Sequence, residues 1–150
     1  MSGESDLIKL YSQRILALAS DIPHTERLSA PDATVRKRAP LCGSTVTVDA
    51  KMDGEHLSDL GLEVKACALG QAAAAVVGSA AIGRTRVQVE EARDALKAML
   101  KSDGPAPEAP FDGLEVLRPA RDYKNRHASV MLTLDALCEA MQQAEQAQTA

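Results

Sequence analysis

The chain has 150 residues and a formal net charge of −4, which is long enough for one domain whose core needs no disulfides. The acidic balance argues against a general nucleic-acid-binding surface. Its aromatic residues are one Phe and two Tyr, too few for the base-stacking surfaces of single-strand-binding modules. We therefore expect a single domain over residues 1–150 that does not bind nucleic acid.

The sequence shows no sign of a secretion signal or a membrane segment. No charged-then-apolar leader opens it, and glycine and polar residues interrupt its longest apolar run, residues 66–82. We expect a cytoplasmic protein that has no contact with a membrane. In that reducing compartment, three cysteines indicate metal binding or reactivity more often than a disulfide.

The first third of the chain predicts one helix followed by a connector. Residues 6–20 carry apolar side chains at three- and four-residue spacing, which is typical of an amphipathic helix. Ile22-Pro23 ends this helix. Residues 24–32 then show no regular pattern, and we predict an irregular connector there.

Three strand patterns follow, over residues 33–39, 44–52 and 56–66. Asp53-Gly54 separates the second pattern from the third and is a strong hairpin signal. The apolar residues of the second pattern fall on alternate positions, which is typical of a strand with one buried face. These features predict a small three-stranded antiparallel sheet.

The rest of the chain predicts helices. Residues 68–82 are nearly all small or apolar, so this helix should be buried on most sides, and Thr85 is a candidate N-cap for the next one. Three prolines fall in residues 102–113, which we predict to be a flexible surface insertion. The last helix should run over about residues 126–143. The pattern indicates an α+β fold, in which the sheet packs against four to five helices.

Two of the three cysteines should meet at one end of the sheet. Cys42 and Cys67 lie at nearly equal distances before and after the turn at residue 54, and each is close to a glycine. Two thiols so placed indicate a metal or sulfur site, although their wide separation excludes a zinc-knuckle loop. The alternative is that they are two unrelated small residues.

Cys67 and His127 each begin a predicted helix. The exposed N–H groups and the dipole at a helix N-terminus stabilise negative charge, which favours the thiolate that binds metals and attacks electrophiles. Imidazole is a common metal ligand. The alternatives are a small core residue for Cys67 and a surface histidine for His127.

Three short motifs, in this order, resemble those of the U-type iron–sulfur cluster scaffold proteins, the family of NifU N-terminal, IscU and SufU proteins. They are Leu41-Cys42-Gly43-Ser44, Ala66-Cys67-Ala68-Leu69-Gly70-Gln71-Ala72 and Arg126-His127-Ala128-Ser129-Val130. Tyr11 to Ile15 is similar to the opening helix of that family, so the resemblance covers about residues 7–142. It implies a three-stranded sheet packed on helices, with three cysteines and an aspartate converging at one end on a zinc ion or a nascent cluster.

The chain departs from the family at two of those positions. Cys42 and Cys67 stand at the first two cysteine positions, His127 stands at the third, and Ser44 replaces the aspartate. The resemblance thus implies that Cys42, Cys67 and His127, with Ser44 as a further candidate, hold zinc or an iron–sulfur cluster. Both exchanges remove negative charge and should weaken the binding of Zn²⁺ or Fe²⁺. Cys138 lies about 16 Å further along the helix axis, so we expect a core residue there.

The resemblance implies a cluster-assembly scaffold or sulfur acceptor, not an enzyme. A cysteine desulfurase would deliver sulfur to Cys42 or Cys67, and apo iron–sulfur proteins would receive the product. The alternative is a divergent member that binds zinc as a structural or regulatory partner without scaffold activity. A third hypothesis is a hydrolase or transferase with Cys67 as nucleophile and His127 as base, for which the sequence supplies no evident orienting acid.

Overall fold

The computed structural model describes residues 12–41 and 43–149, apart from the side chains of residues 148 and 149. Residues 12–19 are helical and precede the sheet. The remaining elements are β1 (Ala33–Arg38), β2 (Thr45–Asp53), β3 (His56–Lys65), α2 (Ala68–Ala80), α3 (Arg86–Ser102), the 3-10 segments η1 (Asp112–Asp122) and η2 (Lys124–Arg126), and α4 (His127–Thr149). The predicted α+β fold, with a three-stranded antiparallel sheet packed against helices, is confirmed.

The β2–β3 hairpin determines which loops meet. The sheet order is β1-β2-β3, and both pairings are antiparallel. Asp53 pairs with His56 across the turn, where Gly54 takes the positive φ of 63° that glycine tolerates best. At the far end Thr45 pairs with Lys65. The residues just before β2 and just after β3 therefore lie at the same end of the sheet, as the hairpin signal predicted.

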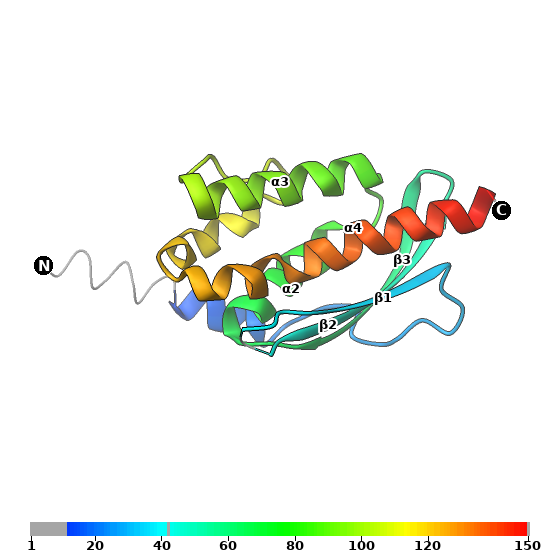
Figure 1. Ribbon diagram of the computed structural model, residues 1–150. Coiled ribbons are helices and arrows are strands. Elements are labelled where there is room, and N and C mark those ends of the chain that lie inside the picture. Colours follow the sequence, from blue (N-terminus) through cyan, green and yellow to red (C-terminus); the bar gives the residue numbers. More distant parts are fainter. Residues whose placement is uncertain (1–11, 42, 150) are drawn as a thin grey trace, which may run out of the picture.

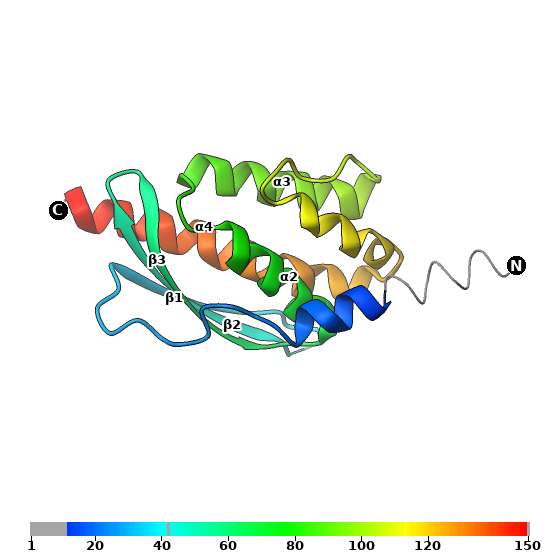
Figure 2. The ribbon, with the colours of Figure 1, turned by 180° about the vertical axis from the view of Figure 1, so that it is seen from behind.

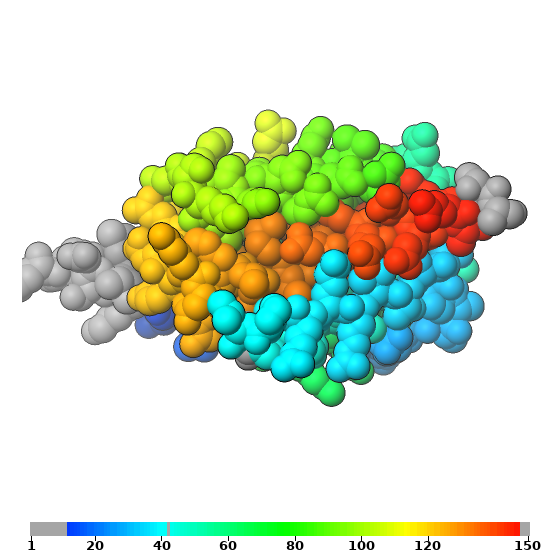
Figure 3. Space-filling view, in the orientation of Figure 1, coloured from blue at the N-terminus to red at the C-terminus, as the bar shows by residue number. Residues whose placement is uncertain are grey.

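One face of the sheet carries the helices. Val46, Val48 and Ala50 alternate along β2 and are buried on this face. Helix α4 packs on β1 and β2, and α2 lies beside it next to β3 (Figures 1 and 2). Helix α3 packs on α4. The segment η1 packs against both α3 and α2. On the face shown in Figure 3, the outer side of α4 stays visible between α3 and β1.

The opposite face of the sheet is covered by the connector before β1. Asp49 of β2 points to this face and is fully buried. Its carboxylate accepts hydrogen bonds from Arg27 Nε at 2.6 Å, from Thr34 Oγ1 at 2.6 Å and from the backbone N–H of Leu28 at 2.9 Å. This one carboxylate therefore pins the connector to the sheet.

Gly61 makes room for that connector. It pairs with Asp49 across β2 and β3. A Cβ atom on Gly61 would lie 2.9 Å from the carbonyl oxygen of Glu26 and 3.1 Å from the backbone nitrogen of Leu28. Any larger side chain would push the connector away from the Asp49 carboxylate.

The helices follow the sequence pattern with two differences. The predicted N-cap Thr85 is confirmed, and it forms a capping box with Gln88. Helix α4 continues to Thr149, beyond the predicted end near residue 143, because Ala144 is buried and Glu145 pairs with Arg86 at 2.9 Å. Within residues 102–113, predicted to be a surface segment, Phe111 is 2 % exposed and belongs to the core.

None of the helices in the described ranges is long and apolar enough to cross a membrane.

The replacement Asp49→Asn should destabilise the fold. Burial alone would raise the pKa of Asp49, but the hydrogen bonds from Arg27, Thr34 and Leu28 outweigh it and hold the pKa below the usual range. Such a carboxylate stabilises the fold above its unfolded pKa, about 3.9, and this stabilisation is lost as the pH falls through the folded pKa. We expect a loss of about 3 kcal/mol at neutral pH, measured by urea unfolding.

The difference between wild type and Asp49→Asn should shrink below about pH 4. Asp59→Asn, which changes an exposed carboxylate on β3, is the matched control and should leave the unfolding free energy nearly unchanged. Equal stability of Asp49→Asn and Asp59→Asn at neutral pH would contradict the anchoring role of Asp49.

Candidate functional site

Cys67 lies between the end of β3 and the first turn of α2. It is the N-cap residue of this helix, with an extended backbone, and its side chain makes no capping hydrogen bond. The Gln71 N–H donates to its carbonyl oxygen at 2.9 Å, which starts the helical ladder. The thiol is half-buried. It therefore sits beside the unpaired N–H groups of a 13-residue helix while remaining reachable from outside.

A serine on α4 is the side-chain partner of this thiol. Cys67 Sγ lies 3.5 Å from Ser129 Oγ, and Ser129 Oγ in turn donates to Ser44 Oγ at 3.0 Å. Ser129 and Ser44 are 1 % and 4 % exposed, so no bulk solvent competes for these bonds. The turn before β2, the start of α2 and the start of α4 thus meet in one thiol–hydroxyl row, which we call the Cys67–Ser129–Ser44 row.

Gly70 makes this meeting possible. A Cβ atom at this position would lie 2.7 Å from Ser129 Oγ and 2.9 Å from the Cβ of Ala66. Glycine inside a helix is less favourable than alanine by roughly 0.5–1 kcal/mol. Its presence in the first turn of α2 is explained by the close approach of α2 to Ser129.

These contacts favour the thiolate of Cys67. Burial alone would raise the pKa of this thiol, but the contact with Ser129 and the nearby backbone N–H of Gly70 and side chain of Arg126 outweigh it. The pKa of Cys67 therefore lies below its ordinary value. A larger thiolate fraction at neutral pH makes this sulfur a better nucleophile.

The other predicted thiol, Cys42, lies outside the described residues. Ser44, two residues further on, is in the row, and the β2–β3 register places the turn before β2 beside Cys67. Among residues 12–41 and 43–149, no three His, Cys, Asp or Glu side chains gather closely enough to hold a metal ion. A metal site through Cys42 and Cys67 stays a prediction.

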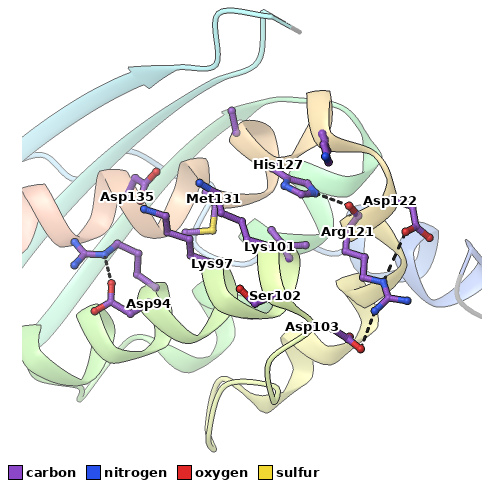
Figure 4. A pocket seen from close by; sticks show the side chains of 14 residues that line it. Asp94, Lys97, Lys101, Ser102, Asp103, Arg121, Asp122, His127, Met131 and Asp135 are labelled. Atoms are coloured by element: carbon purple, nitrogen blue, oxygen red, sulfur yellow. Dashed lines mark hydrogen bonds and ion pairs between the residues drawn. The ribbon is translucent and has the colours of Figure 1, made fainter.

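His127, the predicted third ligand, makes its hydrogen bonds elsewhere. Its Nε2 lies 3.1 Å from the carbonyl oxygen of Ala120 and 3.0 Å from that of Arg121, at the end of η1. The imidazole lines an open groove of about 1250 Å³ between α3 and the start of α4 (Figure 4). Residues two apart on an α-helix are about 200° apart around its axis, so His127 and Ser129 leave α4 on different sides. Ligation by His127 also stays a prediction.

The hydrogen bonds of Cys67 and His127 therefore run to different partners. Cys67 contacts Ser129, whereas His127 Nε2 contacts two backbone carbonyls. This arrangement gives no support to the third hypothesis, in which His127 would act as the base for a Cys67 nucleophile.

Cys138 is a core residue, as predicted. It is 3 % exposed, and burial raises the pKa of its thiol to about 12. A thiol in this state is inert toward metals and electrophiles at neutral pH. Cys138 therefore serves as an internal reference for reactions of the site cysteines.

The sequence interpretation missed Ser129, although two signals were available. Gly70 lies in the first turn of a helix, between Leu69 and Gln71, where glycine is unfavourable, and this indicates a close contact on that side. Ser129 is a small polar residue directly before the apolar run of residues 130–132 in the predicted last helix. A buried hydroxyl needs a hydrogen-bond partner, so this serine was a candidate for the site.

No protein-family model matches the chain, and no curated protein does. Among solved structures, the chain is similar to a nitrogen-fixing NifU-like protein (N-terminal) from Brucella abortus. The two share 46 % sequence identity with a TM-score of 0.87, over 91 % of this chain and 94 % of that one.

A second solved structure has the same fold at lower identity. It is a putative iron–sulfur cluster assembly scaffold protein for the SUF system from Fervidobacterium islandicum AW-1. Its identity to this chain is 20 %, with a TM-score of 0.77, over 89 % of this chain and 97 % of that one. At this identity the likeness establishes the fold alone.

The replacement Ser129→Ala should make Cys67 less reactive. Without the hydroxyl, the thiolate loses a hydrogen bond that lowers its pKa, so alkylation by iodoacetamide at neutral pH should slow on the order of tenfold. The rate is measured by mass spectrometry in a Cys42→Ser background. Ser79→Ala, at an exposed position on α2, is the control and should react like the parent. An unchanged rate in Ser129→Ala would contradict the contact with Cys67.

Proposed function

The chain belongs to the family of U-type iron–sulfur cluster assembly scaffolds, which includes NifU-like N-terminal proteins, and we propose that it serves cluster assembly as a scaffold or sulfur acceptor. Cys42 and Cys67 are the residues through which it acts. The observation that supports this proposal most is the position of Cys67, a half-exposed thiol at the start of α2 whose hydrogen bonds favour the thiolate.

The chemistry of sulfur acceptance requires such a thiol. A thiolate attacks the outer sulfur of a donor persulfide, and the rate depends on the thiolate fraction and on access. Cys67 meets both conditions, whereas the buried Cys138 meets neither. We propose a cysteine desulfurase as the donor and apo iron–sulfur proteins as the recipients.

A third ligand would complete a site for iron or zinc, and His127 keeps this role as a proposal. Carbonyl oxygens only accept hydrogen bonds, so Nε2 carries the proton in the contacts with Ala120 and Arg121, and Nδ1 is left to bind a metal. Metal-ligating histidines usually donate their second N–H in this way. The imidazole would have to approach Cys67 from the groove side of α4.

Sulfur transfer tests the proposal directly. The protein is incubated with a pyridoxal-phosphate cysteine desulfurase and cysteine, and persulfides are located by mass spectrometry of the peptides. Cys67→Ser should lose most of the accepted sulfur, and Cys42→Ser should lower it. Cys138→Ser should accept as much as the wild type, because its thiol is buried with a raised pKa. Full sulfur acceptance by the double variant Cys42→Ser/Cys67→Ser would refute the proposal.

The second candidate is a zinc-binding partner without scaffold activity. It is favoured by the two departures from the family's site, Ser44 and His127, because both count against scaffold activity. This candidate predicts about one zinc per chain by elemental analysis, lost in Cys42→Ala, Cys67→Ala and His127→Ala. A scaffold instead predicts a stable visible chromophore after anaerobic reconstitution with iron and sulfide. Zinc retention without a chromophore would decide for the second candidate.

A further inference from the structure

The Cys67–Ser129–Ser44 row contains one sulfur and two hydroxyl oxygens. The spacings are 3.5 Å from Cys67 Sγ to Ser129 Oγ and 3.0 Å from Ser129 Oγ to Ser44 Oγ. Both serines are buried, and a Cβ on Gly70 would collide with Ser129 Oγ. The positions next to the thiol are therefore filled by groups that the packing holds in place.

These groups do not fit a resident metal. Zinc and iron in proteins are held by thiolate, imidazole and carboxylate, which either carry negative charge or are strong nitrogen donors. A serine hydroxyl carries no negative charge and has no nitrogen donor. Among the three groups of the row, a divalent cation would find one such ligand, the Cys67 thiolate.

The same groups do fit an anionic sulfur. Each hydroxyl has one O–H to donate and can rotate to suit its partner. When the thiol loses its proton, Ser129 can turn its O–H from Ser44 Oγ to the sulfur. Hydrogen bonds to charged acceptors are stronger than those between neutral groups. The row therefore stabilises a negative charge on the Cys67 sulfur. Its two hydroxyls supply no negative charge that would balance the charge of a metal ion.

We infer that the site carries sulfur as a persulfide on Cys67, and that Ser44 and Ser129 are the residues that select sulfur transfer over metal retention. This inference rests on the proposed function and narrows it to the sulfur-acceptor role. Sulfur would pass through the site to a later protein. Iron would combine with the sulfur on that protein, or would bind at this site only transiently.

The transfer step balances without an oxidant or reductant. The Cys67 thiolate attacks the outer sulfur of a donor persulfide, R–S–SH. A bond forms between Cys67 Sγ and that sulfur while the S–S bond of the donor breaks. The products are the Cys67 persulfide and the donor thiolate, R–S⁻, which keeps the bonding electron pair and the negative charge. Ser129 faces the sulfur that gains and loses this charge.

The test is to introduce metal ligands at both serines. Outer-sphere changes alone alter metal affinity by about 10- to 100-fold, so Ser44→Asp/Ser129→Cys should raise zinc affinity at least a hundredfold. Zinc per chain is measured by elemental analysis after desalting against a competing chelator under reducing conditions. The double variant should retain about one zinc per chain and the wild type much less. Wild-type protein should instead gain one sulfur on Cys67 when treated with inorganic polysulfide.

The control variant Ser58→Asp/Ala128→Cys adds the same two groups outside the row, on β3 and at an exposed position of α4. It should retain as little zinc as the wild type. Circular dichroism checks that each variant is folded, and Ser129→Cys alone replaces the double variant if that one is not.

The possible outcomes separate this inference from the proposed function. If the wild type accepts sulfur but holds zinc as tightly as Ser44→Asp/Ser129→Cys, the inference is overturned and the proposed function stands. If the wild type neither accepts sulfur nor holds zinc, both are overturned. Sulfur acceptance by the wild type, with zinc retention confined to the double variant, supports both.

Discussion

The site depends on the close approach of α2 to α4, where a Cβ atom on Gly70 would lie 2.7 Å from Ser129 Oγ. It brings a serine hydroxyl to the thiol at the helix start. The sheet supplies the other half of the arrangement, because the β2–β3 register puts Ser44 and Cys67 at one end. Asp49 holds the connector on the far face and so stabilises the sheet that carries both loops.

The sheet and its site-bearing end could be predicted because they depend on short-range signals. Asp53-Gly54 determines the hairpin, and the hairpin determines that residues near 43 and 67 are neighbours. Which of His127 and Ser129 lies beside Cys67 could not be predicted in the same way. On a helix, a shift of two residues turns a side chain by about 200°, and the rotation of α4 is set by what packs against it. The good ligand chemistry of imidazole says nothing about that rotation.

A similar limit applies to Asp49. Alternation along β2 predicted that its neighbours Val48 and Ala50 face the core. It could not predict that the opposite face is also covered, because two partners of Asp49, Arg27 and Leu28, lie in the connector, which has no periodic pattern. These two residues became recognisable as partners only when the chain path was known. Long-range polar contacts of this kind leave little trace in sequence spacing.

The chain keeps the fold of its relatives while its site is arranged around neutral hydroxyls. The most direct test of this arrangement is a cross-link between α2 and α4. In a Cys42→Ser background, Ser129→Cys places a second thiol beside Cys67, and mild oxidation should close a disulfide between α2 and α4, detected by mass spectrometry without reduction. Ala128→Cys in the same background should form none, because this position of α4 is exposed to solvent. A disulfide in Ala128→Cys and none in Ser129→Cys would contradict the account.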